Sequence, residues 1–182
     1  TIGILAVAID ILIGVTFGAL AGYLGGVVDD VLMLVAQAVM VIPLLFLILF
    51  LMSVVEKPSI YAIVGVIALV GWPGVMRLVR GEFLRQRELD YVTAARALGA
   101  STVRILARHV LPTAMPPLLV QATLGMAGAI LSEAALSFLG LGVQPPTPSW
   151  GTMINGGRVH LLDAPHLTVF PGLFLAIVVL GF

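Results

Sequence analysis

The sequence predicts an all-α integral membrane protein, with about five transmembrane helices in this chain. Hydrophobic residues make up 60% of the 182 residues and charged residues only 10%, whereas a soluble domain carries about 25% charged residues. The mean hydropathy is +1.18. Most apolar residues occur in runs of about 20, the length of helix that crosses a bilayer core of about 30 Å. These runs do not alternate as barrel strands do, so we expect helices.

The expected spans follow one another with mostly short links between them. They are residues 2–24, 31–52, 59–79, 110–136 and 167–182. The first span carries a small residue at every fourth position, namely Gly14, Gly18 and Gly22, and such a stripe lets a second helix approach closely. Pro43 interrupts the second span and Pro73 the third, which predicts bends at both places.

Basic residues are concentrated in the link between the third and fourth spans. Seven of the nine lie between Arg77 and Arg108, and the other two are Lys57 and Arg158. Because basic residues near span ends accumulate on the cytoplasmic side, we expect this link (residues 80–109) inside and the other long link, 137–166, outside. A soluble, charged helix hairpin is the alternative. Since the chain starts and stops within apolar runs, we also expect it to be trimmed, with a further span upstream.

The cytoplasmic link itself predicts two short helices joined by a tight turn. Leu89 to Leu98 consists of helix formers with a face of alanines, and Gly99 follows as a residue that can take a positive φ. Ser101 can cap a second helix over residues 102–110. A helix that rests on lipid headgroups is the alternative, but alanine and glycine suit insertion into a protein cleft better than burial among acyl chains.

The same residues resemble the EAA loop of ABC-importer permeases, whose pattern is Glu-Ala-Ala, three residues, Gly, nine residues, Ile, one residue and Leu-Pro. The positions in register with that pattern are Ala94, Ala95, Gly99, Leu111 and Pro112. Thr93 stands where the pattern has glutamate, and His109 stands where it has isoleucine. These two departures leave the helix–Gly–helix shape intact.

A second stretch makes the resemblance more specific. Residues 136–151, which read LSFLGLGVQPPTPSWG, look like the outer loop of the C-type permease subunit in dipeptide, oligopeptide and nickel importers, and residues 71–84 resemble the same group. The likeness covers essentially the whole chain. It implies a bacterial inner-membrane subunit with six spans when complete, paired with a homologous B-type permease. It further implies two ATP-binding subunits and an extracytoplasmic binding protein as partners.

The resemblance also implies which residues contact the ATP-binding subunits. They are Asp90, Thr93, Ala94, Ala95, Arg96, Leu98, Gly99, Ala100, Ser101 and Arg104. In such importers the whole loop, here Asp90 to Pro112, transmits a coupling free energy between the ATP-binding subunits and the pore. A dipeptide, an oligopeptide, a nickel chelate and a glutathione-like solute all remain open as the transported substrate.

The composition excludes several chemistries for this chain. A phosphate cradle needs a lysine after a glycine-rich loop, and the only lysine lies in Glu56-Lys57-Pro58. The absence of cysteine excludes a disulfide framework, a thiolate zinc site and an iron–sulfur cluster, and the three histidines lack metal-ligand spacing. We therefore expect a transporter subunit that is not an enzyme and binds no cofactor or metal, while partner subunits use ATP and magnesium.

Two acidic residues lie within or near spans: Asp10 in the first and Glu133 toward the outer end of the fourth. Because burying a charge in a membrane is costly, both are candidates for the pathway or an outer gate, with a structural pairing as the alternative. They also support the rival function, an ion-coupled secondary transporter, although we find no internal repeat of the kind such carriers show. A hydrolase built from Ser132, His166 and Asp163 lacks a nucleophile elbow.

Overall fold

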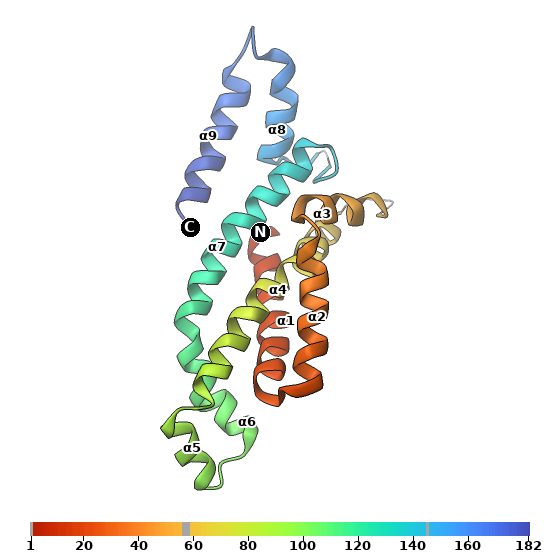
Figure 1. Cartoon of the computed structure of the whole chain (residues 1–182). Helices are drawn as coiled ribbons and strands as arrows, with labels where there is room; N and C mark the ends of the chain where they lie inside the picture. The colour runs from red at the N-terminus through yellow and green to blue at the C-terminus, as the bar shows by residue number, and fades with distance from the viewer. Residues whose placement is uncertain (1, 56–58, 145) are drawn as a thin grey trace. The chain divides into compact units, whose positions relative to one another are not determined.

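The computed structural model describes residues 2–55, 59–144 and 146–182. Over those residues the structure is helical and contains no strand (Figure 1), which confirms the all-α prediction. The elements are α1 Ile2–Leu24, α2 Gly26–Val41, α3 Leu44–Ser53, α4 Ile60–Gln86, α5 Asp90–Ala97, α6 Thr102–Ile105, a π-helical segment Leu106–Val110, α7 Leu111–Phe138, α8 Trp150–Gly157, a 3-10 turn Arg158–His160 and α9 His166–Leu180.

Three of the described helices, α1, α4 and α7, are long and apolar enough to cross a membrane. Helices α2 and α3 make a fourth span if the pair counts as one helix bent by 88°. Pro43 is the N-cap residue of α3 at this break, which confirms the bend predicted for the second span, because proline has no N–H to continue the helix. Helix α9 is apolar but only 15 residues long, so the count of five stays a prediction.

Some helix boundaries differ from those predicted. The link left between the first two predicted spans, residues 25–30, is shorter in the structure, because α2 already begins at Gly26. Helix α4 runs unbroken through Pro73 to Gln86, past the predicted end of the third span at residue 79; prolines are tolerated in membrane helices when neighbouring groups satisfy the freed carbonyl. The link over residues 137–166 contains α8, a helix that the sequence did not predict.

The chain divides into two compact units. The first unit contains the residues up to Ala8, residues 42–70 and residues 123–182. The second unit contains residues 9–41 and 71–122. The predicted coupling loop therefore belongs to the second unit, and the predicted outer loop belongs to the first.

In the second unit, the glycine stripe of α1 brings that helix against α4. A Cβ added at Gly14 would lie 2.5 Å from the Cβ of Val75, and one at Gly18 would lie 2.6 Å from the carbonyl oxygen of Met76. Gly22 meets α4 in the same way. Because side chains do not fit at such distances, only glycine allows this packing. The close helix approach predicted from the stripe is thus confirmed, and its partner is α4.

In the first unit, α8 packs tightly against both α7 and α9. A Cβ added at Gly151, near the start of α8, would meet the carbonyl oxygen of Ala134 and lie 2.8 Å from the Cβ of Ser137. At the other end of α8, a Cβ on Gly157 would lie 2.5 Å from the Oγ1 of Thr168. Figure 1 shows α8 and α9 as a helical hairpin at the C-terminal end of the chain.

Candidate functional site

The turn that follows α5 is closed by a Schellman motif. The Ala100 amide donates to the carbonyl oxygen of Ala95 and the Gly99 amide donates to that of Arg96, each at 3.0 Å. Gly99 has a φ of 79°, a left-handed conformation that costs other residues about 1–2 kcal/mol. The predicted helix and the positive φ at Gly99 are both confirmed. We call residues 90–110 the α5–α6 hairpin (Figure 1).

One side of this hairpin is anchored to the hydrophobic core of the second unit. Val92 and Ile105 are each 1% exposed, and they belong to one cluster with Val79 and Phe83 of α4. The rest of the cluster consists of Val75, Val110, Ala114 and Leu118, and among the partly buried residues packed against it are Ala95 and Ala100. The hairpin is therefore continuous with the packing of α4 and α7.

The structure thus divides the predicted contact residues into two groups. Ala95 and Ala100 lie partly buried against the core cluster. Ala95 follows Val92 by about one helical turn and so lies on the same side of α5. The exposed members are Asp90, Thr93, Ala94, Arg96, Leu98, Gly99, Ser101 and Arg104. Leu98 is 88% exposed, more than any other exposed large hydrophobic residue in the described part of the hairpin. Ser101 lies at the N-cap position of α6, since its carbonyl oxygen accepts from the Ile105 amide at 3.0 Å.

Polar residues surround the base of the hairpin. A hollow of about 530 Å³ is lined by Tyr23, Leu24, Arg87, Glu88, Thr93 and Arg96. Thr93, the residue at the position of the family's glutamate, therefore shares a hollow with two arginines. Arg87 donates from Nε to the Glu88 carboxylate at 3.0 Å. Elsewhere in the unit, the Nε and Nη2 of Arg80 donate to the two oxygens of the Asp29 carboxylate and so join α4 to α2.

Asp10 lies in the second unit and is 8% exposed. Its carboxylate sits against Gly71 of α4, where any side chain would collide with it. Among the described residues, its Oδ1 has no hydrogen-bond partner. A role for Asp10 in the pathway stays a prediction.

Glu133 lies in the first unit, near the end of α7, and is partly buried. Its Oε1 accepts a hydrogen bond from the Oγ of Ser137 at 2.6 Å. The same Oγ accepts from the Val143 amide at 3.1 Å. Ser137 thereby ties the carboxylate to the loop after α7, which holds Glu133 in one orientation.

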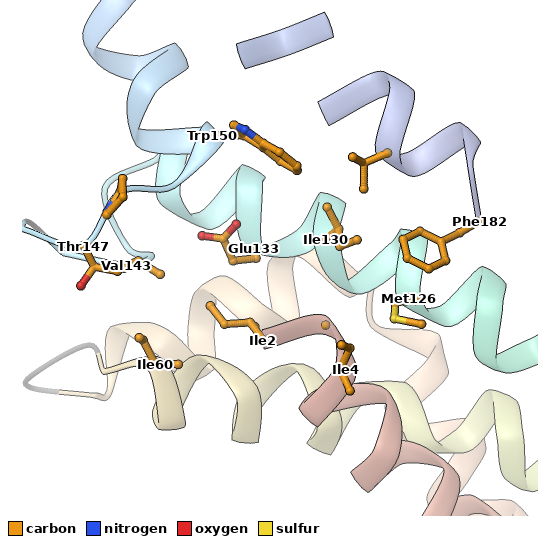
Figure 2. A pocket seen from close by; sticks show the side chains of 13 residues that line it. Ile2, Ile4, Ile60, Met126, Ile130, Glu133, Val143, Thr147, Trp150 and Phe182 are labelled. Carbon is orange, nitrogen blue, oxygen red and sulfur yellow. The ribbon is translucent and has the colours of Figure 1, made fainter. Parts of the chain in front are cut away.

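Glu133 lines two hollows in the first unit, with volumes of about 520 Å³ and about 410 Å³. Pro148 and Trp150 line both hollows as well. Figure 2 shows the side chains of Glu133 and Trp150 pointing into the larger one from α7 and α8. Sequence reasoning missed Trp150 as a site residue. The Ser-Trp-Gly triplet was the available signal, because Ser149 caps α8 and Gly151 allows close packing.

Comparison with known proteins gives the family. Residues 14–182 match the model of the family "Binding-protein-dependent transport system inner membrane component". The chain belongs to this family. It is therefore a multi-pass protein of the bacterial inner membrane, in agreement with the several apolar helices of the structure.

Individual relatives in this family are similar over the whole chain. The oligopeptide transport system permease protein OppC of Bacillus subtilis (strain 168) is 40% identical over 181 residues, which cover 100% of this chain and 59% of the relative. The di/tripeptide transport system permease protein DppC of Pseudomonas aeruginosa (strain UCBPP-PA14) is 40% identical, covering 99% and 59%. The glutathione transport system permease protein GsiD of Pectobacterium atrosepticum is 37% identical, covering 99% and 60%. The chain thus spans less than two thirds of the length of these relatives.

Proposed function

We propose that this member of the inner membrane component family is a permease subunit of an ATP-driven ABC importer. It forms half of a translocation pore for dipeptides, oligopeptides or a related small solute. The names of the relatives, which are permeases of peptide and glutathione transport systems, support this reading. A homologous B-type permease completes the pore, and an extracytoplasmic binding protein delivers the solute. Hydrolysis of ATP is left to two partner subunits.

The α5–α6 hairpin is the observation that carries this proposal. Its exposed side offers Leu98 beside the left-handed Gly99, and its other side is fixed to the core through Val92 and Ile105. Burying a leucine side chain in a partner contributes about 1.5–3 kcal/mol. We therefore place Leu98 at the centre of the contact with an ATP-binding subunit, and the exposed hairpin residues around it at the rim. Movement of that subunit is then passed to α4 and α7 through packed side chains.

The rival function is an ion-coupled secondary transporter that uses Asp10 and Glu133. The similarity to named permeases of transport systems favours the importer. The two readings differ in their energy source. Uptake by the importer requires ATP together with its ATP-binding subunits, whereas a carrier requires only an ion gradient.

Two substitutions in the hairpin test the proposed coupling in the complete transporter, reconstituted in vesicles with both permeases and the ATP-binding subunits. Leu98→Asp should weaken the ATPase contact by about 1.5–3 kcal/mol, or roughly tenfold to a hundredfold. Gly99→Arg should add the left-handed strain of about 1–2 kcal/mol and place a bulky group in the contact. Both variants should insert normally but lose ATP-dependent uptake and co-purification of the ATPase subunits.

Matched controls separate docking from folding. Gly99→Asn should retain docking, because asparagine tolerates the left-handed conformation far better than most residues. Leu162 is 97% exposed and lies in the first unit, so Leu162→Asp makes the same chemical change away from the hairpin and should leave ATPase co-purification unchanged. If Leu98→Asp and Gly99→Arg both support normal ATP-driven uptake, the hairpin is not the coupling contact.

A further inference from the structure

Among the described residues that line the larger hollow of the first unit, Glu133 is the only charged one. The lining residues are Ile2, Gly3, Ile4, Ile60, Met126, Ile130, Glu133, Val143, Thr147, Pro148, Trp150, Val178 and Phe182. Figure 2 shows the Glu133 carboxylate facing this mostly apolar surface, with Trp150 pointing into the same space. A volume of about 520 Å³ lies within the roughly 300–1,000 Å³ that is usual for small-molecule sites.

The carboxylate has no basic partner among the described residues of the structure. The three ion pairs found there are Arg80–Asp29, Arg85–Glu82 and Arg87–Glu88, all in the second unit. In the described part of the first unit, the single arginine is Arg158, and its guanidinium lies over the ring of Phe138 at 5.9 Å. Among the described residues, the Glu133 carboxylate therefore has Ser137 as a hydrogen-bond partner and no cation beside it, so a carboxylate on a mostly apolar surface is left to bind one.

The surrounding structure fixes both Glu133 and Trp150 in place. Ser137 bonds the Glu133 carboxylate from one side. Trp150 is the first residue of α8, whose start is held by a capping box between Ser149 and Thr152 and by the tight contact of Gly151 with α7. A charged group and an aromatic ring held by such supporting contacts form a preorganised site rather than two freely moving side chains.

We propose that Glu133 and Trp150 bind the protonated amino group of the transported solute. A carboxylate makes short, charge-assisted hydrogen bonds to an ammonium group, and the face of an indole attracts the same cation. The apolar remainder of the hollow then accepts small aliphatic side chains. This inference rests on the proposed permease function and names its substrate class: solutes with a free amino group, such as dipeptides with an unblocked N-terminus.

Equilibrium binding to the complete transporter in nanodiscs, without the binding protein, tests this site directly. The probes are radiolabelled dialanine and N-acetyl-dialanine, which differ in the charge of the amino group. The wild type should bind dialanine at least about tenfold more tightly, the effect expected for a hydrogen bond to a charged group. Glu133→Gln should abolish this preference, whereas Glu133→Asp should retain most of it.

Asp163 provides the matched control, because it is exposed, belongs to the same unit and does not line either hollow. Asp163→Asn removes the same charge and should keep the wild-type preference for the free amine. Trp150→Leu should reduce the preference by a smaller factor than Glu133→Gln, since the cation then loses the ring but keeps the carboxylate.

Two results would overturn the inference. They are a wild type that binds both probes equally and a Glu133→Gln variant that keeps the preference. ATP-driven uptake of dialanine by the wild type is measured in parallel, and its absence would count against the permease function instead. Uptake without amine preference would overturn the binding site alone.

Discussion

Alanine at Gly18 would force apart helices α1 and α4, which approach closely at this glycine. The added Cβ would lie 2.6 Å from the carbonyl oxygen of Met76 and 2.7 Å from the Cβ of Val79. Favourable contacts between carbon atoms lie at about 3.5–4.0 Å, so α1 and α4 would have to separate by about 1 Å. Overpacking costs about 1–3 kcal/mol. We expect about 2–3 kcal/mol here, because the group that must move is helix backbone.

The intrinsic preference of alanine for helices partly offsets this cost. Alanine is more favourable than glycine within a helix by about 1 kcal/mol, so the net destabilisation by Gly18→Ala should be about 1–2 kcal/mol. Gly81→Ala in α4 is the matched control, because no atom lies within 4 Å of its added Cβ. That variant should gain up to about 1 kcal/mol. The two variants should therefore differ by about 2–3 kcal/mol.

Unfolding of the full-length permease in mixed detergent micelles measures this difference. The protein is titrated with sodium dodecyl sulfate and its helix content is followed by circular dichroism, which gives a free energy of unfolding for each variant. The ordering should be Gly81→Ala, wild type and Gly18→Ala, from most to least stable. Equal stability of the two variants would show that α1 and α4 do not pack through the glycine stripe.

Further substitutions test other parts of the structure. Asp29→Asn breaks the partly buried ion pair with α4 and should cost about 1–3 kcal/mol, whereas Glu82→Gln, in a more exposed pair, should cost at most about 1 kcal/mol; equal costs in the same detergent titration would contradict this difference. Asp10→Asn removes a buried carboxylate whose Oδ1 has no hydrogen-bond partner among the described residues, so it should not lower the free energy of unfolding; if it abolishes uptake while the protein stays folded, Asp10 belongs to the pathway. Because the chain has no cysteine, Ser101→Cys and Leu162→Cys should react with an impermeant maleimide only from the inside and only from the outside, respectively, and the reverse pattern would overturn the predicted topology.

The features that could be predicted from sequence depend on one or a few neighbouring residues. The left-handed turn at Gly99 follows from a glycine placed after a run of helix formers. The close approach of α1 follows from glycines at every fourth position, although the sequence could not name α4 as the partner. The bend at Pro43 follows from the missing N–H of proline. Each of these is a local constraint on the backbone.

The features that could not be predicted depend on contacts between distant segments. Helix α8 reads WGTMINGG, and its three glycines lower its intrinsic helix preference by about 1 kcal/mol each. Two of them, Gly151 and Gly157, pack tightly against α7 and α9, a gain that no local pattern reveals. The pairing of Glu133 with Trp150 has the same origin, since the two residues share a hollow only once α8 is docked. The inward packing of Ala95 and Ala100 likewise depends on where the core of the unit lies.

The position of the core cluster in the second unit determines whether a movement of the α5–α6 hairpin would reach α4 and α7. A loop held only at its two ends would absorb a displacement of Leu98 by changing its own backbone angles. In the α5–α6 hairpin, the Schellman hydrogen bonds lock the turn, and Val92 and Ile105 are packed among side chains of α4 and α7. Because packed interiors have few voids and transmit strain, a displacement of the turn must move those helices as well. For the proposed coupling contact, we therefore expect the buried residues to carry coupling and the exposed ones to determine which partner binds.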